Sequence, residues 1–202
     1  MTRQKVVLRH VESDTYLDAE LIERVDPAFA KRAEDAWQTY LASAKAEAMS
    51  GNRDFPNLEH DHWRWQDKVN LTHHLLPYPT LGIECDGQVQ GLMLLETDGH
   101  FAREQAQAGS PLVYVNLLAT APWNLPEVVD PPRYRGVGTI LLTVAASLSV
   151  DLGFKGRIGL HSLPKSERWY DRVGLTCLGP DPNKQNLKYY EMTPDQAQDL
   201  IR

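Results

Sequence analysis

The spacing of apolar residues changes along this chain, and this change limits the possible folds more than any other feature. Over residues 27–50 and again over 61–71 the apolar positions follow the period of a helix. Over residues 81–85 they alternate with polar neighbours, as in a half-buried strand. A helical period returns over residues 137–152. The pattern predicts a mixed α/β protein that is not a regular array of alternating strands and helices.

Local signals mark the ends of several of these segments. Asp26 followed by Pro27 is typical of a helix start, and Gly51 is expected to end that helix. Asp86-Gly87 predicts a two-residue hairpin turn, because both positions must accept a positive φ. Other strands are expected at 6–9, 88–97 (with 92–95 buried on both faces), 112–120, 156–161, 174–178 and 187–192, and short helices at 165–172 and from 193.

Composition narrows the class of protein. A chain of 202 residues suits one domain, and its net charge of -6 argues against a nucleic-acid partner. Two cysteines, Cys85 and Cys177, form neither a disulfide framework nor a zinc signature, and we expect both to be buried. The N-terminus lacks the apolar core of a signal peptide, and no apolar run reaches membrane-spanning length. We therefore expect a cytoplasmic protein with no membrane partner.

The segment RYRGVGT, residues 133–139, lies between a strand and an apolar helix. Backbone N–H groups at a helix start bind anions, and glycines let the backbone approach phosphate closely. Arg133 and Arg135 add positive charge. No Gly-Lys-Ser/Thr follows as in a P-loop, and Leu141 occupies the place of the third glycine of a dinucleotide fingerprint. Taken alone, the segment is as compatible with a tight turn as with a phosphate site.

A second motif, HSLPKSERWYDRVGL, follows at residues 161–175 and contains Trp169-Tyr170 and Gly174-Leu175. Arg-x-x-Gly-x-Gly at 133–138 resembles the acetyl-CoA signature of the GCN5-related N-acetyltransferase (GNAT) superfamily, and 161–175 resembles the family's second motif. The hairpin at Asp86-Gly87 is similar to the family's second and third strands. The resemblance covers residues 81–192.

This resemblance implies a single domain over residues 1–202 with a mixed, mostly antiparallel central sheet flanked by helices. Residues 1–75 would form a strand and a helical N-terminal elaboration on the acceptor side, and 81–192 the acetyl-CoA-binding core. Two departures concern the substrate side. Residues 121–132 lengthen the step from the family's fourth strand to the Gly loop, and Leu163 stands near the usual Asn of the second motif.

The resemblance also implies an activity: acetyl transfer from acetyl-CoA to a primary amine of a small molecule or protein, by direct attack on the thioester and without a metal. Tyr170 matches the family's general acid, which protonates the leaving thiolate. A backbone amide of strand 118–120 would polarise the thioester oxygen while that strand pairs with the pantetheine arm. The cofactor-binding residues implied are Leu118, Ala119, Thr120, Arg133, Tyr134, Arg135, Gly136, Val137, Gly138, Thr139, Ser166 and Trp169.

Several alternatives stay open on the sequence. The general base could be Glu84, Glu96, Asp98, His161 or a chain of waters. Residues 59–62, EHDH, could be metal ligands, but a capped helix start is preferred because no further His or Cys pair completes a set of ligands. Trp63 and Trp65 could face an acceptor pocket or pack on the sheet.

The alternative function is a non-catalytic acyl-CoA-binding sensor or interaction module. A nucleotide-phosphate enzyme is a weaker third interpretation, because the lysine and the Mg²⁺-binding hydroxyl of a P-loop are missing. A homodimer through the last two strands is compatible with the sequence.

Overall fold

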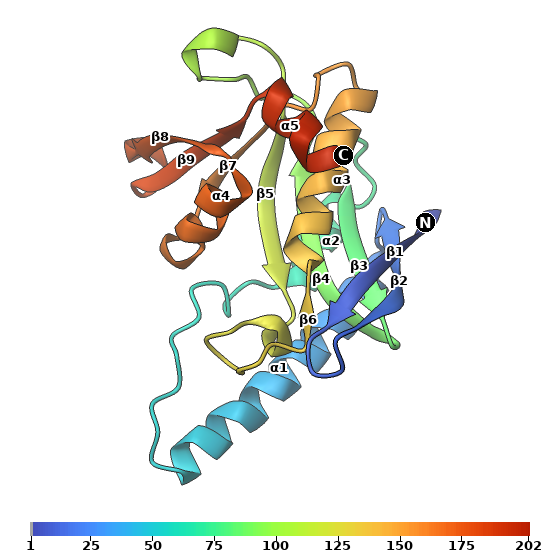
Figure 1. Ribbon diagram of the computed structural model, residues 1–202, viewed down its shortest axis with the longest axis vertical. Helices are drawn as coiled ribbons and strands as arrows, with labels where there is room; N and C mark the ends of the chain where they lie inside the picture. The colour runs from blue at the N-terminus through green and yellow to red at the C-terminus, as the bar shows by residue number, and fades with distance from the viewer. Residues whose placement is uncertain (1) are drawn as a thin grey trace. The chain divides into compact units, whose positions relative to one another are not determined.

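The computed structural model describes residues 2–202 and has the mixed α/β architecture that the sequence predicts (Figure 1). Nine strands form one mostly antiparallel sheet in the order β6-β1-β2-β3-β4-β5-β7-β9-β8, and helices accompany it. The chain divides into two compact units, Met1–Met93 with Leu118–Gly138, and Leu94–Leu117 with Thr139–Arg202.

The first unit begins with a hairpin of β1 (Thr2–His10) and β2 (Thr15–Glu23), drawn in blue in Figure 1. The sequence predicted only a short strand at 6–9, so β2 was missed and β1 is longer than expected. Burial in β2 does not alternate cleanly, because Leu21 and Ile22 are both buried while Tyr16 is exposed. A strand of this kind lacks the two-residue period on which the sequence argument depends.

Helix α1 (Pro27–Ser50) has the predicted ends. The Asp26 carboxylate accepts a hydrogen bond of 2.7 Å from the backbone N–H of Phe29, and Gly51 caps the other end. The helix packs on β3 (Thr80–Cys85), where a Cβ added to Gly82 would lie 2.7 Å from Cε1 of Phe29. This contact explains why β3 is almost wholly buried instead of half-buried as expected.

Helix α2 (Trp65–Thr72) starts later than the predicted segment 61–71. Arg64 is extended, with φ -105° and ψ 94°, and the residues before it form turns, so Trp63 lies outside the helix. The predicted hairpin turn between β3 and β4 (Gln88–Glu96) is confirmed, with φ of 51° at Asp86 and 69° at Gly87. The run Leu92–Leu95 is buried, as predicted.

The remaining elements follow the predicted order closely. Strand β5 (Val113–Thr120) leads through an irregular connection to the two-residue strand β6 (Tyr134–Arg135), which the sequence analysis did not predict. The later elements are α3 (Val137–Asp151), β7 (Ile158–Ser162), α4 (Glu167–Val173), β8 (Thr176–Asp181), β9 (Leu187–Met192) and α5 (Pro194–Ile201). Short 3-10 turns lie at Gln105–Gln107, Pro122–Asn124, Pro164–Ser166 and Pro182–Lys184.

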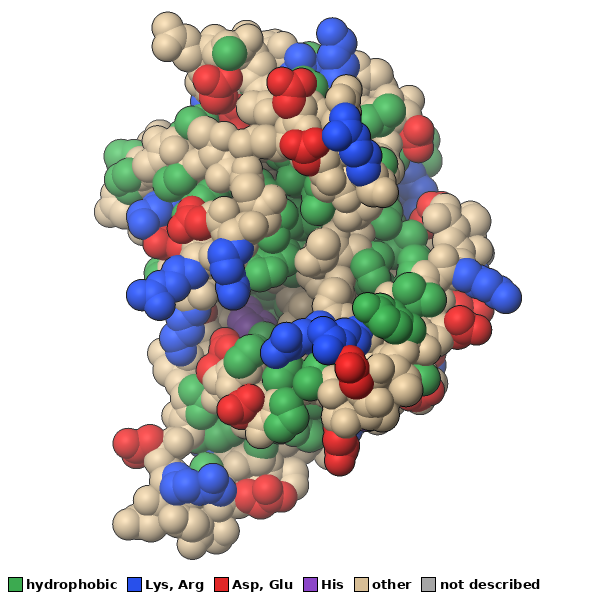
Figure 2. Space-filling model, in the orientation of Figure 1, with side chains coloured by type: hydrophobic (Ala, Val, Ile, Leu, Met, Phe, Trp, Pro, Cys, Tyr) green, Lys and Arg blue, Asp and Glu red, His purple; other side chains and the backbone are tan. Residues whose placement is uncertain are grey.

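The exposure of the cysteines and of the charged side chains can be compared with what the composition predicts. Cys85 is buried but Cys177 is exposed, contrary to the expectation for both, because Cys177 lies on the edge strand β8. Acidic and basic side chains are interspersed over the face drawn in Figure 2. Among the described helices, none combines the length and the apolar character needed to cross a bilayer.

Candidate functional site

The Gly loop is held at its start by strand pairing. In the antiparallel pair of β6 and β1, Arg135 lies opposite Arg9, and the backbone N–H of Val11 donates to the carbonyl of Arg133 at 3.0 Å. The chain then turns at Gly136, whose φ is 95°, and α3 begins at the next residue. A Cβ placed on Gly136 would meet nothing within 4 Å. The backbone at the helix start is therefore open to a ligand, in a conformation that favours glycine.

A buried amide network fixes this loop from behind. Gln90 of β4 is fully buried, and its Oε1 accepts hydrogen bonds from Nε1 of Trp123 at 2.8 Å and Nδ2 of Asn124 at 3.1 Å. Oδ1 of Asn124 in turn accepts from the backbone N–H of Tyr134 at 3.0 Å. The sequence predicted no role for Gln90 and Asn124, since a buried amide and a surface amide look alike in a sequence.

The side chain of Tyr134 points inward. Its ring is buried, and its hydroxyl donates to Oδ2 of Asp86 at 2.6 Å. Burial, and then this hydrogen bond, raise the pKa of the Tyr134 phenol. Of the residues predicted in this loop, Tyr134 and Val137 are thus buried and present only backbone to a ligand.

The two arginines of the loop are placed differently. The guanidinium of Arg133 lies 5.2 Å from the ring centre of Trp123, and its Nη1 donates to Oε1 of Gln88 at 2.7 Å. Arg135 is exposed and has no hydrogen bond or ion pair with any side chain of residues 2–202. Arg135 is therefore the loop cation that is available to an anionic ligand.

Strand β5 separates from its parallel neighbour β7 part of the way along. Pairing joins Val113, Tyr114 and Val115 to residues 158–160 and stops there, although β5 continues through Asn116 and Leu117 and β7 through residue 162. The predicted cofactor residues Leu118, Ala119 and Thr120 follow this point of separation. Backbone amides that lose a strand neighbour need another hydrogen-bond partner.

Tyr170 lies in the middle of α4, and Gly174 ends this helix with a φ of 96°. The ring is 6% exposed and contacts the rings of Trp169 and Tyr190, at centroid distances of 4.8 Å and 5.7 Å. The hydroxyl makes no hydrogen bond within the part of the chain that the structure describes, and burial raises its pKa. The phenol is therefore protonated at neutral pH and has its proton to donate. Trp169 and Ser166 are half-buried, and the Ser166 side chain makes no capping bond.

The carboxylates considered as a general base differ in their surroundings. Glu84 forms ion pairs with Arg3 and Arg32. Glu96 accepts from Nδ2 of Asn116 and pairs with Nε2 of His100 at 2.7 Å. Asp98 is exposed. Glu84 and Glu96 are thus engaged by partners within their own units.

The fourth candidate, His161, is the centre of a buried chain of hydrogen bonds. Its Nδ1 lies 2.7 Å from the Tyr114 hydroxyl, and its Nε2 lies 3.0 Å from Oδ2 of Asp181, which also accepts from Arg103 at 2.6 Å. Burial lowers the pKa of the His161 imidazole in spite of Asp181. Burial also raises the pKa of Tyr114 to about 12. Both nitrogens of His161 have partners, which suits a structural role as well as a chemical one.

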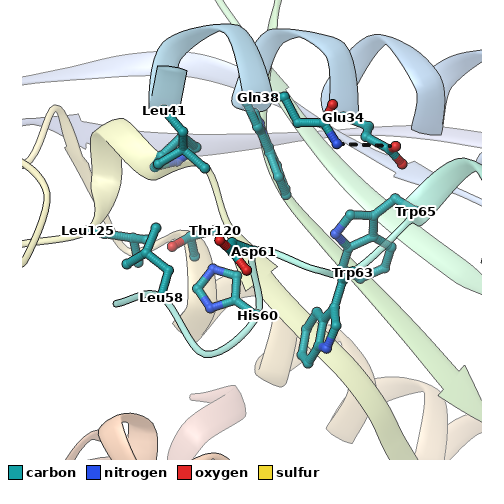
Figure 3. A pocket seen from close by; sticks show the side chains of 12 residues that line it. Glu34, Gln38, Leu41, Leu58, His60, Asp61, Trp63, Trp65, Thr120 and Leu125 are labelled. Atoms are coloured by element: carbon teal, nitrogen blue, oxygen red, sulfur yellow. Dashed lines mark hydrogen bonds between the residues drawn. The ribbon is translucent and has the colours of Figure 1, made fainter. Parts of the chain in front are cut away.

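A small cavity of about 30 Å³ lies between α1, the turn before α2 and the end of β5 (Figure 3). Trp63 and Trp65 both line it, with ring centres 6.0 Å apart, and so does Thr120, the last residue of β5. His60 lines it too, and burial lowers the pKa of this imidazole. Among the described residues, EHDH included, no group of three or more His, Cys, Asp or Glu is placed to hold a metal ion.

Comparison with known proteins gives structural matches only, since no family model and no curated protein matches the sequence. The GNAT domain of S. lividans PAT is 15% identical, with a TM-score of 0.55 over 94% of this chain and 96% of that one. A putative arylalkylamine N-acetyltransferase 7 of the yellow fever mosquito is 16% identical, with a TM-score of 0.51 over 95% and 94%. The PaiA N-acetyltransferase of Thermoplasma acidophilum, solved with coenzyme A, is 14% identical, with a TM-score of 0.50 over 87% and 98%. The chain therefore has the fold of the GCN5-related N-acetyltransferases.

Proposed function

We propose that this protein transfers an acetyl group from acetyl-CoA to a primary amine. The observation that carries the proposal is that the pairing of β5 with β7 ends after Val115, although β5 continues to Thr120. We assign the pantetheine arm to the backbone of Leu118, Ala119 and Thr120, which follow in β5. The open helix start at Gly136 supports it, because such a position favours a pyrophosphate. The structure of the T. acidophilum enzyme with coenzyme A is a precedent for this ligand on this fold.

Each predicted cofactor residue has a role in this proposal. The amides of Gly136, Val137, Gly138 and Thr139 hold the pyrophosphate, and the free guanidinium of Arg135 adds charge. Arg133 and Tyr134 act indirectly, since their contacts with Trp123 and Asp86 keep the loop in place. We assign Ser166 and Trp169 to contact with the cofactor, as the resemblance implies.

The chemistry is one direct substitution. The amine nitrogen attacks the thioester carbon, a C–N bond forms, and the C–S bond breaks. A backbone N–H of Leu118–Thr120 stabilises the oxyanion. The Tyr170 hydroxyl protonates the leaving thiolate and recovers a proton from the former amine. The phenol is in the donating form at neutral pH, and burial raises its pKa further.

The first test compares CoA binding by the wild type with that by two glutamate variants. Gly136→Glu places a side chain and a negative charge at the proposed phosphate site, whereas Gly99→Glu makes the same change at another exposed positive-φ glycine with open space. We expect CoA to raise the melting temperature of the wild type and Gly99→Glu but not of Gly136→Glu.

Turnover is then measured as thiol release from acetyl-CoA with a panel of amines. Release that depends on an amine supports the transferase. Stabilisation by CoA without release on any amine supports instead the non-catalytic acyl-CoA-binding module. A preference for ATP over CoA, or no stabilisation by CoA, contradicts the proposal.

A further inference from the structure

The cavity defined by Glu34, His60, Trp63, Trp65 and Thr120 is formed entirely within the first compact unit. Thr120 ends the stretch of β5 to which the proposed function assigns the pantetheine arm. A ligand in this cavity would therefore touch the residue that lies beside the proposed thioester. Figure 3 shows the His60 ring near Thr120, Leu58 and Leu125, with the two indoles on the other side of the view.

The imidazole of His60 has no hydrogen-bond partner among residues 2–202; its one ring contact is with Trp63, at 5.6 Å between centroids. Burial lowers the pKa of this imidazole, and the nearby carboxylates only partly oppose the effect. The charged and titratable neighbours are Glu59, Asp61 and His62 on its own turn, Glu127 after β5, and Glu34 of α1 across the cavity. A neutral imidazole without a partner in a cavity can accept a proton from a ligand.

The charges around the cavity favour a cation. Glu34 and Asp61 line it, and none of its described lining residues is Lys or Arg. Glu34 is held in place, because its Oε2 accepts from the backbone N–H of Gln66 at 3.2 Å and its Oε1 from Gln38 at 3.4 Å. Indole faces also attract an ammonium group. A carboxylate next to the amine would be repelled by the same acidic groups.

The size of the cavity limits the shape of the ligand. About 30 Å³ is room for one or two waters. The terminal CH₂–NH₃⁺ of an unbranched chain is of this size, whereas a branched carbon bearing the amine is larger. The Nε1 of Trp37 is bonded to the carbonyl of Val89 at 3.0 Å, so this wall presents an apolar ring and no donor.

We infer that this cavity binds the amine end of the acceptor, that the acceptor is an unbranched primary alkylamine without a carboxylate beside the amine, and that His60 takes its proton. This inference rests on the proposed function. The chemistry is shared by free alkylamines and by the lysine side chain.

The proton balance of the step is simple. Neutral His60 removes one proton from R–CH₂–NH₃⁺ and later releases it to solvent. The neutral amine forms the C–N bond as the C–S bond breaks. The nitrogen then loses a second proton to Tyr170, which replaces the proton that Tyr170 gave to the sulfur. The products are the acetamide, the CoA thiol and one released proton.

The test measures kcat/KM for 1-aminobutane, a peptide with one internal lysine, 2-aminopropane and alanine, each with acetyl-CoA. The variants are His60→Gln and, as a matched control, His62→Gln, which changes an exposed neighbour outside the cavity lining. We expect 1-aminobutane or the lysine peptide to be preferred over the branched amine and alanine. Which of the two is preferred identifies the source of the alkylamine.

At pH 7 we expect His60→Gln to lower kcat/KM by about 10²-fold, the usual size of a general-base effect, and His62→Gln to leave it unchanged. Because the pKa of His60 lies below its usual range, the wild type should keep its activity below pH 6.5. In His60→Gln, kcat/KM should instead rise steadily with pH up to the pKa of the amine. Stabilisation by CoA should be the same in all three proteins.

The outcomes separate this inference from the proposed function. Wild-type rates and pH profile in His60→Gln, or a preference for alanine, would overturn the inference and leave acetyl transfer standing. CoA binding without acetylation of either alkylamine would overturn the substrate class. If the wild type does not bind CoA, the proposed function itself fails.

Discussion

At the scale of single residues, burial favours Tyr170 as a proton donor and His60 as a proton acceptor. Loss of solvent disfavours the charged form of each group, so it raises the pKa of the phenol and lowers that of the imidazole. At neutral pH Tyr170 therefore has a proton to give and His60 has a lone pair to accept one. Neither side chain hydrogen bonds to a described residue, so both remain available to a substrate.

Replacement of Tyr170 by Phe removes this proton donor and keeps the packed ring. We expect kcat at pH 7 to fall by about 10²-fold, with little change in the KM for acetyl-CoA, because the hydroxyl acts on the leaving sulfur. Tyr190→Phe is the control, since it removes another phenol, bonded to Asp171 at 3.1 Å, in the neighbouring ring. Steady-state thiol release decides the question, and an unchanged kcat in Tyr170→Phe would remove this residue from the mechanism.

At the scale of elements, the position of β6 depends on a residue of another strand. Gln90 of β4 accepts from Trp123 and Asn124, and Asn124 accepts from the first residue of β6. Its own side-chain N–H groups donate to the carbonyls of Cys85 and Gln88 at 3.1 Å and 3.2 Å. One buried side chain thus ties the connection before the Gly loop to the β3–β4 hairpin.

The variant Gln90→Leu leaves the buried indole N–H of Trp123 without an acceptor, and Nδ2 of Asn124 keeps only its 3.4 Å bond to the backbone carbonyl of residue 90. Each such group costs about 1–3 kcal/mol, so we expect the free energy of unfolding to fall by about 2 kcal/mol or more. CoA binding should also weaken, because β6 sets the start of the loop. Gln88→Leu is the control, since it loses a bond to exposed Arg133 instead. Urea denaturation and titration with CoA measure the two effects, and equal losses in both variants would contradict the anchoring role.

At the scale of the whole molecule, stability should depend on acid-sensitive groups of the second unit. The Arg103 guanidinium, and then His161, hold the pKa of Asp181 well below its usual range. Burial lowers the pKa of His161. In both cases the unfolded chain binds a proton at a higher pH than the folded chain does. The favourable contribution of ionised Asp181 is therefore lost as the pH falls, and buried His161 lowers the stability once the unfolded histidine takes up a proton.

We expect the free energy of unfolding to be steady between about pH 7 and 8 and to fall below about 6.5, where unfolded histidine takes up a proton. A second fall should begin below about pH 4, where unfolded aspartate is protonated. Urea denaturation at a series of pH values tests this. Asp181→Asn should reduce the fall in the free energy of unfolding below about pH 4. Asp199→Asn, which changes an exposed residue of α5, should leave that fall unchanged. Constant stability from pH 7 to 5 would contradict the role of His161.

The sequence predicted those features that depend on neighbouring residues. The cap at Asp26, the turn at Asp86-Gly87 and the glycine at the start of α3 are local, because each follows from the backbone needs of a few consecutive residues. The sequence missed β2 and placed the start of α2 too early, because distant residues decide which side chains are buried there. The assignment of Arg133 and Arg135 as cofactor residues stays a prediction, but only the structure distinguishes the engaged guanidinium from the free one.

By itself the sequence determined the fold class, the order of most elements and the motif that opens α3. Hydrophobic period, capping and turn chemistry act over a few consecutive residues and can therefore be recognised in the sequence. Tertiary structure alone decided where β5 leaves β7, which amides support β6, and that His60 meets Thr120 and two indoles in one cavity. These features depend on residues far apart in the chain, whose contacts exist only after the sheet has formed and water has been excluded.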